Sequence, residues 1–184
     1  AEATARFASL VAPETLLAGF DEQGRVVATF GSRDLALTVP GGGTLAMAGT
    51  TQVTVLPTHR RRGLLAEMMA RHLAQARDRG QPLAGLWASE ETIYGRFGYG
   101  PAVPSVFLRL PGGLDLAKGS AAVSLRYLNV DEALELLPPV HDQACTMVVG
   151  HLGRSPAWWR GRVFQEEPTE GASNLRPVVA ERAG

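Results

Sequence analysis

The residues best suited to chemistry form a basic turn between a strand-like run and a helix-like run. Residues 52–56 are rich in β-branched side chains, and Arg60, Arg61, Arg62 and Gly63 follow them. A helix that begins directly after such a turn presents backbone amides without intrahelical partners, and its dipole favours negative charge there. Glycine lets a ligand approach the backbone closely, and arginine supplies positive charge for phosphate groups. The turn is therefore predicted to bind an anion such as a pyrophosphate.

The spacing around this turn excludes two common phosphate-binding motifs. The sequence has no Gly-Lys-Ser/Thr segment, which a Walker loop requires, and Gly63 supplies one of the three glycines of a dinucleotide fingerprint. Three arginines in a row can also be a solvated turn without a ligand, or part of a nucleic-acid surface. Nucleic-acid binding is disfavoured, because 18 basic and 18 acidic side chains leave no net charge and no stacking aromatics stand near the turn.

Histidine and cysteine residues give no basis for a metal site or a thiol nucleophile. His59 and His72 are too far apart in sequence to share one helical turn, and no acidic partner has metal-ligand spacing. His72 falls on an apolar helical stripe, where a hydrogen-bonded boundary residue is expected. Cys145 is the single cysteine, which excludes an intrachain disulfide and a cysteine-based zinc site. With no histidine or basic residue next to it, it is expected to be buried by packing.

The elements that must position the basic turn begin with strands. Runs at residues 25–30, 35–39 and 44–56 have strand character, and Gly49 suggests a bulge in the third. Short turns between these runs favour an antiparallel meander. Apolar residues at helical spacing then cover residues 64–76, which predicts a long helix directly after the turn.

Shorter patterns follow this helix. An apolar run at residues 83–88 indicates a buried parallel strand, and Ser89 is expected to cap a short helix over 90–97. The remaining predicted segments are a weak helix over 1–17, a strand at 103–110, a Gly-rich linker at 111–120, a strand at 121–128, a helix capped by Asp131 and running to about 137, a helix opening at Ser155-Pro156, and a strand at 176–182. Trp158 and Trp159 are expected to pack against the first domain or a partner subunit.

Two blocks of the sequence resemble a known family. Arg60-x-x-Gly63-x-Leu65 resembles the Arg/Gln-x-x-Gly-x-Gly/Ala signature of the GNAT N-acetyltransferases, with Leu65 in place of the final small residue. The order of strands, basic turn, long helix, apolar strand and short helix is that of a GNAT core. Residues 53–65 and 88–101 are more narrowly similar to the enhanced intracellular survival (Eis) branch of that superfamily.

The resemblance implies an α/β fold with a mixed sheet, namely the GNAT acyl-CoA N-acyltransferase fold. Residues 1–110 would form the acetyl-CoA-binding domain, lacking its N-terminal strand and helix, and 111–120 would be a linker. Residues 121–184 would be the incomplete start of a second GNAT-like domain. The chain starts without an initiator Met, and we expect a piece of a longer protein.

The resemblance also implies roles for individual residues. Acetyl-CoA would be the cosubstrate, and no metal would be needed. The residues that would bind it are Val53, Thr54 and Val55 along the pantetheine arm, Arg60, Arg61, Arg62, Gly63, Leu64 and Leu65 at the phosphates, and Ser89 and Glu90 beside the splayed strands. Tyr94 would be the general acid for the departing thiolate, although on the residues alone it could be an ordinary half-buried aromatic.

The same resemblance implies the reaction and the partners. Acetyl would pass directly to a primary amine of an aminoglycoside, a polyamine or a lysine side chain in a ternary complex. The family's general base is a terminal carboxylate in a later domain, with Glu90 and Glu91 as possible local substitutes. Family members are hexamers, so a homo-oligomer is expected.

The composition is that of a soluble globular protein, with 45% hydrophobic and 20% charged residues. No run approaches the length of a membrane span, no signal peptide is evident, and a cytoplasmic location is expected. The alternative function is a non-catalytic regulatory module on the same fold that binds CoA or a lipid.

Overall fold

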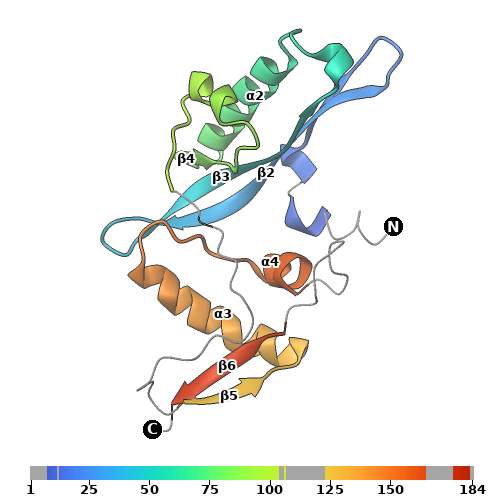
Figure 1. The fold of residues 1–184 in the computed structure, drawn as a ribbon. Coiled ribbons are helices and arrows are strands. Elements are labelled where there is room, and N and C mark those ends of the chain that lie inside the picture. Colours follow the sequence, from blue (N-terminus) through green and yellow to red (C-terminus); the bar gives the residue numbers. More distant parts are fainter. Residues whose placement is uncertain (1–7, 12, 104–105, 107–122, 165–175, 183–184) are drawn as a thin grey trace.

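The structure is a computed structural model, and it describes residues 8–11, 13–103, 106, 123–164 and 176–182 (Figure 1). Its first half is a four-stranded sheet in the order β1-β2-β3-β4. The strands are β1 (Leu17–Phe20), β2 (Val26–Thr38), β3 (Thr44–Val55) and β4 (Leu83–Gly85). The first three pair antiparallel and β4 runs parallel to β3, so the predicted mixed α/β sheet is confirmed.

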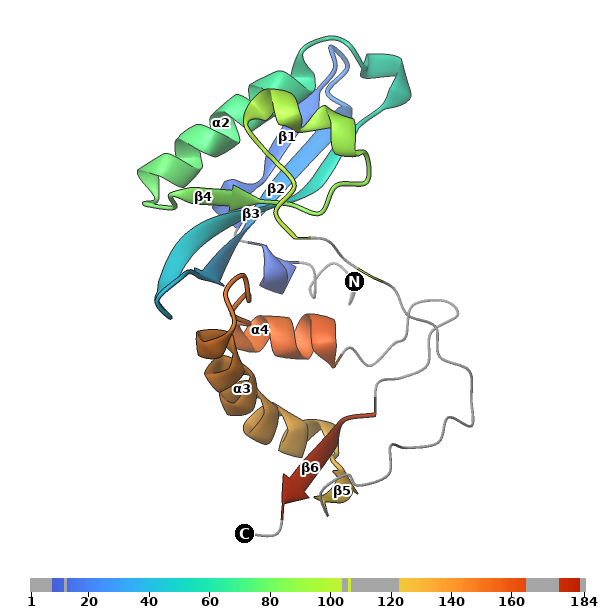
Figure 2. The same ribbon diagram turned by 60° about the vertical axis from the view of Figure 1, so that its left-hand side comes forward.

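Helix α2 (Leu64–Asp78) connects β3 to β4 and covers one face of the sheet (Figures 1 and 2). Its apolar side packs against β2, and the core contains Ala28, Phe30, Met68 and Met69. The helix begins after Gly63, as the 3.6-residue period of its apolar positions predicts. The buried face of α2 thereby fixes the direction in which its N-terminus points.

The strands differ from the prediction in two ways. Residues 25–30 and 35–39 belong to one continuous strand, β2, because β3 pairs with it along almost its whole length. The bulge lies at Gln52, which has a φ of 54° opposite the register shift between Thr29 and Gly31, so its prediction at Gly49 is wrong. Gly49 instead leaves room for the Leu35 side chain, since a Cβ at residue 49 would lie 2.5 Å from Leu35 Cδ1.

Other predicted elements also change in extent. Within the range of the predicted N-terminal helix, residues 8–10 are helical, and a separate 3-10 turn, η1 (Pro13–Thr15), then leads into β1. The parallel strand is limited to β4, and the helix predicted over 90–97 is a pair of 3-10 turns, η3 (Glu91–Ile93) and η4 (Gly95–Phe97). Ser89 does not cap it, because Glu90 occupies the N-cap position without a side-chain bond.

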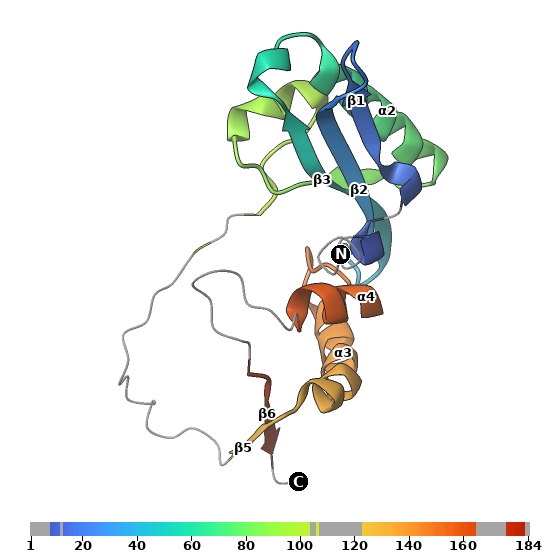
Figure 3. The ribbon, with the colours of Figure 1, turned by 90° about the vertical axis from the view of Figure 1, so that its right-hand side faces the viewer.

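The second half contains β5 (Val123–Tyr127), α3 (Val130–Met147), α4 (Pro156–Trp158), the π-helical turn η5 (Trp159–Val163) and β6 (Val178–Arg182). Strands β5 and β6 form a separate antiparallel ribbon, beyond one end of the first sheet (Figure 3). Helix α3 begins at a capping box made by Asn129 and Glu132, so the prediction of Asp131 as its cap is wrong, and the helix continues ten residues past its predicted end. Its own apolar cluster contains Leu128, Ala133, Trp159 and Phe164.

The two halves are joined through the edge of β2. Where β1 ends, the edge of β2 is taken up by residues 150–153. The Thr38 amide donates to the His151 carbonyl at 2.9 Å, and the Gly153 amide donates to the Ala36 carbonyl at 2.9 Å. The predicted linker 111–120 and most of the predicted strand 103–110 lie outside the described residues, so the proposed domain division stays a prediction. No helix in the described ranges has both the length and the apolar character to cross a membrane.

Candidate functional site

The sheet opens at the end of β4. β3 and β4 pair through Met47, Ala48 and Gly49, whose partners end at Gly85. β3 then continues to Val55, so its edge from residue 50 onward has no β-partner on that side within the described residues. Such an edge presents backbone N–H and C=O groups that a ligand can pair with.

The predicted basic turn lies at the end of this open edge. β3 leads into the 3-10 turn η2 (Pro57–His59), and Gly63 then caps α2 in the left-handed conformation with a φ of 80°. Arg61 is also left-handed, with a φ of 61°. Arg60, Arg61 and Arg62 are exposed, and none forms an ion pair with another described residue.

This arrangement concentrates positive potential at the start of α2. The first amides of the helix point outward, and no carboxylate of the described chain neutralises the three arginines beside them. A Cβ on Gly63 would meet nothing within 4 Å, so the approach to the backbone is open there. The geometry suits a diphosphate with further phosphate charge nearby.

The predicted general acid lies on the other side of the opening, in the 3-10 turns after β4. Tyr94 is half-buried against the core cluster that contains Met68 and Met69, whereas Ser89 and Glu90 are exposed. Burial raises the pKa of Tyr94 above its ordinary value of 10, and the Glu90 carboxylate raises it further. The phenol is therefore protonated at neutral pH, which is the form in which it can donate a proton.

A row of hydrogen-bonded side chains that the sequence pattern did not predict lies beside Tyr94. The Tyr99 hydroxyl is 3.0 Å from Thr50 Oγ1, and the same oxygen is 2.9 Å from His72 Nε2. The Tyr94 and Tyr99 rings meet edge-to-face with centroids 6.1 Å apart. His72 is 1% exposed, and its burial lowers its pKa below the ordinary 6.5, so the imidazole is neutral.

One signal for this row of side chains was present in the sequence, since His72 stands on the apolar stripe of α2 and needs a buried partner. Its predicted hydrogen bond exists, but its position is deep in the core. Tyr99 also bonds through its hydroxyl. Because Tyr99 contacts Tyr94, the hydrogen bond that holds Tyr99 also fixes the ring surface against which Tyr94 packs.

The described residues contain no group of three or more histidine, cysteine, aspartate or glutamate side chains that could hold a metal ion. Cys145 is buried, as predicted, and burial raises the pKa of its thiol. His141, four residues earlier on α3, lies 3.5 Å from the sulfur, a contact that the immediate sequence neighbours of Cys145 do not indicate. A raised thiol pKa disfavours the thiolate that a nucleophile needs.

Comparison with known proteins gives the same fold and family. The family profile described as acetyltransferase (GNAT) domain matches residues 1–102. An uncharacterized N-acetyltransferase of Streptomyces coelicolor is 43% identical over 162 residues, which cover 86% of this chain and 39% of that protein. N-acetyltransferase Eis of Mycobacterium tuberculosis is 41% identical over 137 residues, covering 68% of this chain and 33% of that protein.

Among solved structures, the crystal structure of Eis1 from Mycobacterium abscessus superposes with a TM-score of 0.64 at 30% identity, over 86% of this chain and 42% of that one. A probable N-acyltransferase from Enterococcus faecalis has a TM-score of 0.71 over 98% of this chain and 44% of that one, at 16% identity, which shows the fold alone. The chain thus spans about two fifths of the length of the Streptomyces coelicolor relative. The predicted fold class is confirmed, and the predicted acyltransferase assignment agrees with the family profile and with the names of these relatives.

Proposed function

Because the chain belongs to the GNAT family of acetyltransferases, we propose that it transfers acetyl from acetyl-CoA to a primary amine. The observation that carries the proposal is the open edge of β3, which ends at a glycine-capped helix flanked by three arginines that form no ion pair with the described residues. An extended arm that ends in a diphosphate matches this combination of strand edge and helix N-terminus. A half-buried tyrosine with a raised pKa lies across the opening.

Each predicted binding residue has a role in this proposal. The backbone of Val53, Thr54 and Val55 pairs with the amide-bearing pantetheine arm along the unpartnered edge. The phosphates bind at the turn, through the backbone of Gly63, Leu64 and Leu65 and the side chains of Arg60, Arg61 and Arg62. Ser89 and Glu90 border the opening from the side of Tyr94.

The transfer needs one bond formed and one bond broken. The amine nitrogen attacks the thioester carbonyl carbon, a C–N bond forms, and the C–S bond breaks. Tyr94 donates its phenolic proton to the departing sulfur, and the raised pKa keeps that proton in place until the thiolate develops. A free thiol has a pKa of about 8.5, below that of the phenol, so transfer of this proton is uphill even to a fully developed thiolate. The hydroxyl must therefore lie close to the sulfur, and the tyrosinate must regain a proton from solvent before the next turnover.

The amine must lose a proton to a base. By resemblance to the Eis branch, that base is a terminal carboxylate in a later domain, with Glu90 and Glu91 as local substitutes. Both glutamates are exposed in the turn that precedes Tyr94. Glu90 also acts on the pKa of Tyr94, so a change at Glu90 would affect both proton transfers.

We extend the proposal to the Eis-like branch, its acceptors and its assembly. Support comes from the 41% identity to N-acetyltransferase Eis of Mycobacterium tuberculosis and from the superposition on Eis1. The acceptor classes to test are aminoglycosides, polyamines and lysine side chains, in a cytoplasmic homo-oligomer, a hexamer by resemblance. Residues 121–184 would begin a second GNAT-like domain, which agrees with their separate ribbon and apolar cluster.

The first experiment measures amine-dependent thiol release from acetyl-CoA by the protein. Tyr94→Phe is expected to lower kcat by about 100-fold or more, the scale of general acid catalysis, with little change in acetyl-CoA affinity. Arg61→Ala is expected to raise the KM for acetyl-CoA, whereas Arg71→Ala, on the exposed side of α2, is the charge-matched control. Wild-type turnover by Tyr94→Phe would refute the general-acid assignment. Acetyl-CoA binding without any turnover would instead favour the regulatory CoA-binding module.

A further inference from the structure

Strand alternation divides the chemistry around the opening between the two faces of the sheet. Thr50 reaches His72 on α2, so its side chain lies on the face that α2 covers. Gly49, the preceding residue of β3, therefore faces the opposite side. Arg33 pairs with Gly49 in the register of β2 and β3, so its side chain also leaves the sheet on the face away from α2.

On that second face, Arg33 meets the second half of the chain. Its guanidinium carbon lies 5.1 Å from the ring centroid of Trp158 on α4, a cation–π contact. Its Nε is buried without a hydrogen-bond partner, and Arg33 forms no ion pair with a described residue. Burial lowers the pKa of Arg33, and the positive charge of Arg162 on η5 lowers it further.

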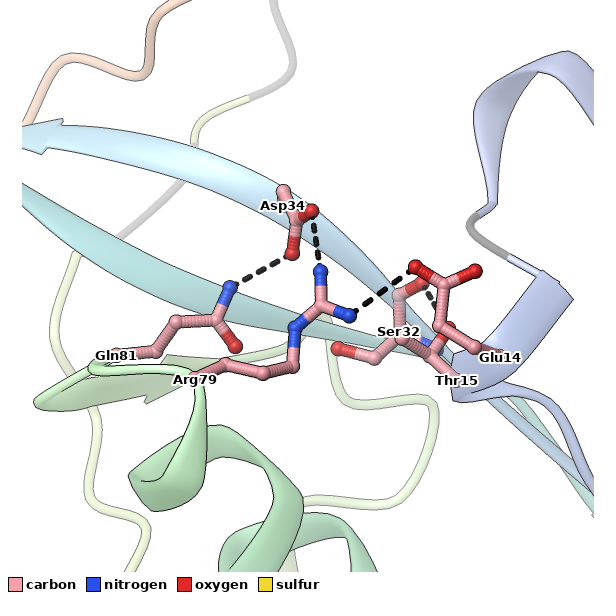
Figure 4. Close-up of polar contacts among 6 residues, drawn as sticks. All are labelled: Glu14, Thr15, Ser32, Asp34, Arg79 and Gln81. Carbon is pink, nitrogen blue, oxygen red and sulfur yellow. Dashed lines mark hydrogen bonds and ion pairs between the residues drawn. The ribbon is translucent and has the colours of Figure 1, made fainter.

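Two carboxylates of the first half, those of Asp34 and Glu14, bind Arg79 and not Arg33. Asp34, its neighbour on β2, points to the other face, where it accepts from Arg79 at 2.6 Å and from Gln81 at 2.7 Å (Figure 4). Glu14 bonds the same guanidinium of Arg79 at 3.2 Å. Glu14 and Asp34 thus both bind Arg79. Arg33 and Arg162, in contrast, form no ion pair with a carboxylate of the described residues.

A buried donor without an acceptor costs free energy, and an anion that accepts from Arg33 Nε would recover it. The positive charge of Arg162, which lowers the pKa of Arg33, adds to that cost, and an anion bound at Arg33 would offset it. The planar donor fork of arginine is matched by carboxylate and phosphate groups.

The position of Arg33 connects this feature with the proposed transfer. Gly49 and Gly85 form the last pair before the sheet opens, and Arg33 lies one strand away from Gly49, roughly 5 Å between backbones. We propose that Arg33, held against Trp158 and near Arg162, is an anion subsite that binds a carboxylate or phosphate group of the acceptor amine. The inference rests on the proposed acetyltransferase function. Among the proposed acceptors, it favours an amine that also carries an anionic group over polyamines and aminoglycosides, because the positive charges of Arg33 and Arg162 repel a second ammonium group.

The test compares acceptors that differ only in the anionic group. Thiol release is measured with ω-amino acids from β-alanine to 6-aminohexanoate, and with alkylamines of the same chain lengths. Phosphoethanolamine serves as the phosphate counterpart of β-alanine, so the two kinds of anion are distinguished. The ratio of kcat/KM for the acid to that for the alkylamine is expected to exceed one at the chain length that spans the site.

Substitution of the arginine assigns the preference to the subsite. Arg33→Met is expected to lower that ratio by about tenfold or more, as expected for loss of a charge-assisted hydrogen bond. Arg33→Lys keeps the charge and loses the fork, so an intermediate ratio is expected, and this variant also controls for folding. Arg77→Met removes the same charge at the exposed end of α2 and should keep the wild-type ratio. An unchanged ratio in Arg33→Met would overturn the proposal.

Direct binding separates this proposal from the proposed function. Glutarate and inorganic phosphate are titrated against the protein at low salt, with tryptophan fluorescence as the readout because Trp158 touches Arg33. Saturable binding that weakens about tenfold in Arg33→Met would support the subsite even if no amine were acetylated. No saturable binding, or equal binding by Arg33→Met, would overturn the subsite while leaving acetyl transfer to be judged by thiol release.

Discussion

Thr50→Val should destabilise the fold more than its small change in shape suggests. The substitution keeps the branched side chain and removes one oxygen, Oγ1, which lies 2.9 Å from His72 Nε2 and 3.0 Å from the Tyr99 hydroxyl. Both partners come from outside β3, one from α2 and one from the segment after η4. Thr50 is itself buried, so the oxygen cannot be replaced by water without opening the core.

The magnitude follows from the burial of the two partners. His72 is 1% exposed, so its nitrogen would lose its partner without a substitute, at a cost of roughly 1–3 kcal/mol. The Tyr99 side chain is half-buried, and its hydroxyl can turn toward water at a smaller cost. We expect a total loss of about 2 kcal/mol in the free energy of unfolding, which shifts the urea midpoint by about 1 M for an ordinary slope.

The assay is urea unfolding of three variants under one set of conditions. Tyr99→Phe removes only the outer bond and should cost less than Thr50→Val. Thr44→Val makes the same chemical change at an exposed position of the same strand and should cost less than about 0.5 kcal/mol. If Thr50→Val were no more destabilising than Thr44→Val, the two bonds would not contribute to stability and the reasoning would fail.

Three further predictions concern other parts of the first half. Because burial lowers the pKa of His72, the unfolded chain takes up a proton that the folded chain does not as the pH falls below about 6.5. The free energy of unfolding should therefore be highest above that pH and decrease below it. Urea unfolding of His72→Gln should show a weaker decrease. Gly63→Ala places a Cβ at a φ of 80° in open space, so strain of about 1–2 kcal/mol is expected in urea unfolding, and Gly95→Ala, in equally open space at ordinary φ, is the control. Arg79→Met should lower the thermal midpoint more than Arg71→Met, because Arg79 pairs with both Glu14 and Asp34, and 1 M salt should reduce the difference.

The long elements were predictable because their periods are strong. Helix α2 follows from apolar residues every three or four positions, and β3 follows from its β-branched run. The division of β2 into two strands was wrong, because Gly31-Ser32-Arg33-Asp34 has the composition of a turn. Ten pairs with β3 override that local preference. The bulge at Gln52 could not be read from residue type, since glutamine gives no conformational signal for a φ of 54°.

The candidate site also has a part that the sequence predicts and a part that it does not. The basic turn is contiguous in sequence, so Arg60 to Gly63 could be predicted together and the structure leaves them together. His72 and Tyr99 lie 22 and 49 positions after Thr50 in the sequence. They reach Thr50 only because α2 and the segment after η4 pack on β3. Contacts of that kind depend on tertiary structure, which a single sequence does not specify locally.

Where the sheet opens near Gly49, side chains on the two faces of the sheet meet different parts of the protein. On the α2 face, Thr50 connects to the ring that supports Tyr94, so that face carries the groups suited to the leaving thiolate. On the other face, Arg33 meets Trp158, which belongs to the second half of the chain. The docking of residues 150–153 on the edge of β2 holds these two side chains together. If Arg33 binds the acceptor as proposed, the second half completes that subsite, since Trp158 supplies the aromatic surface against which Arg33 rests.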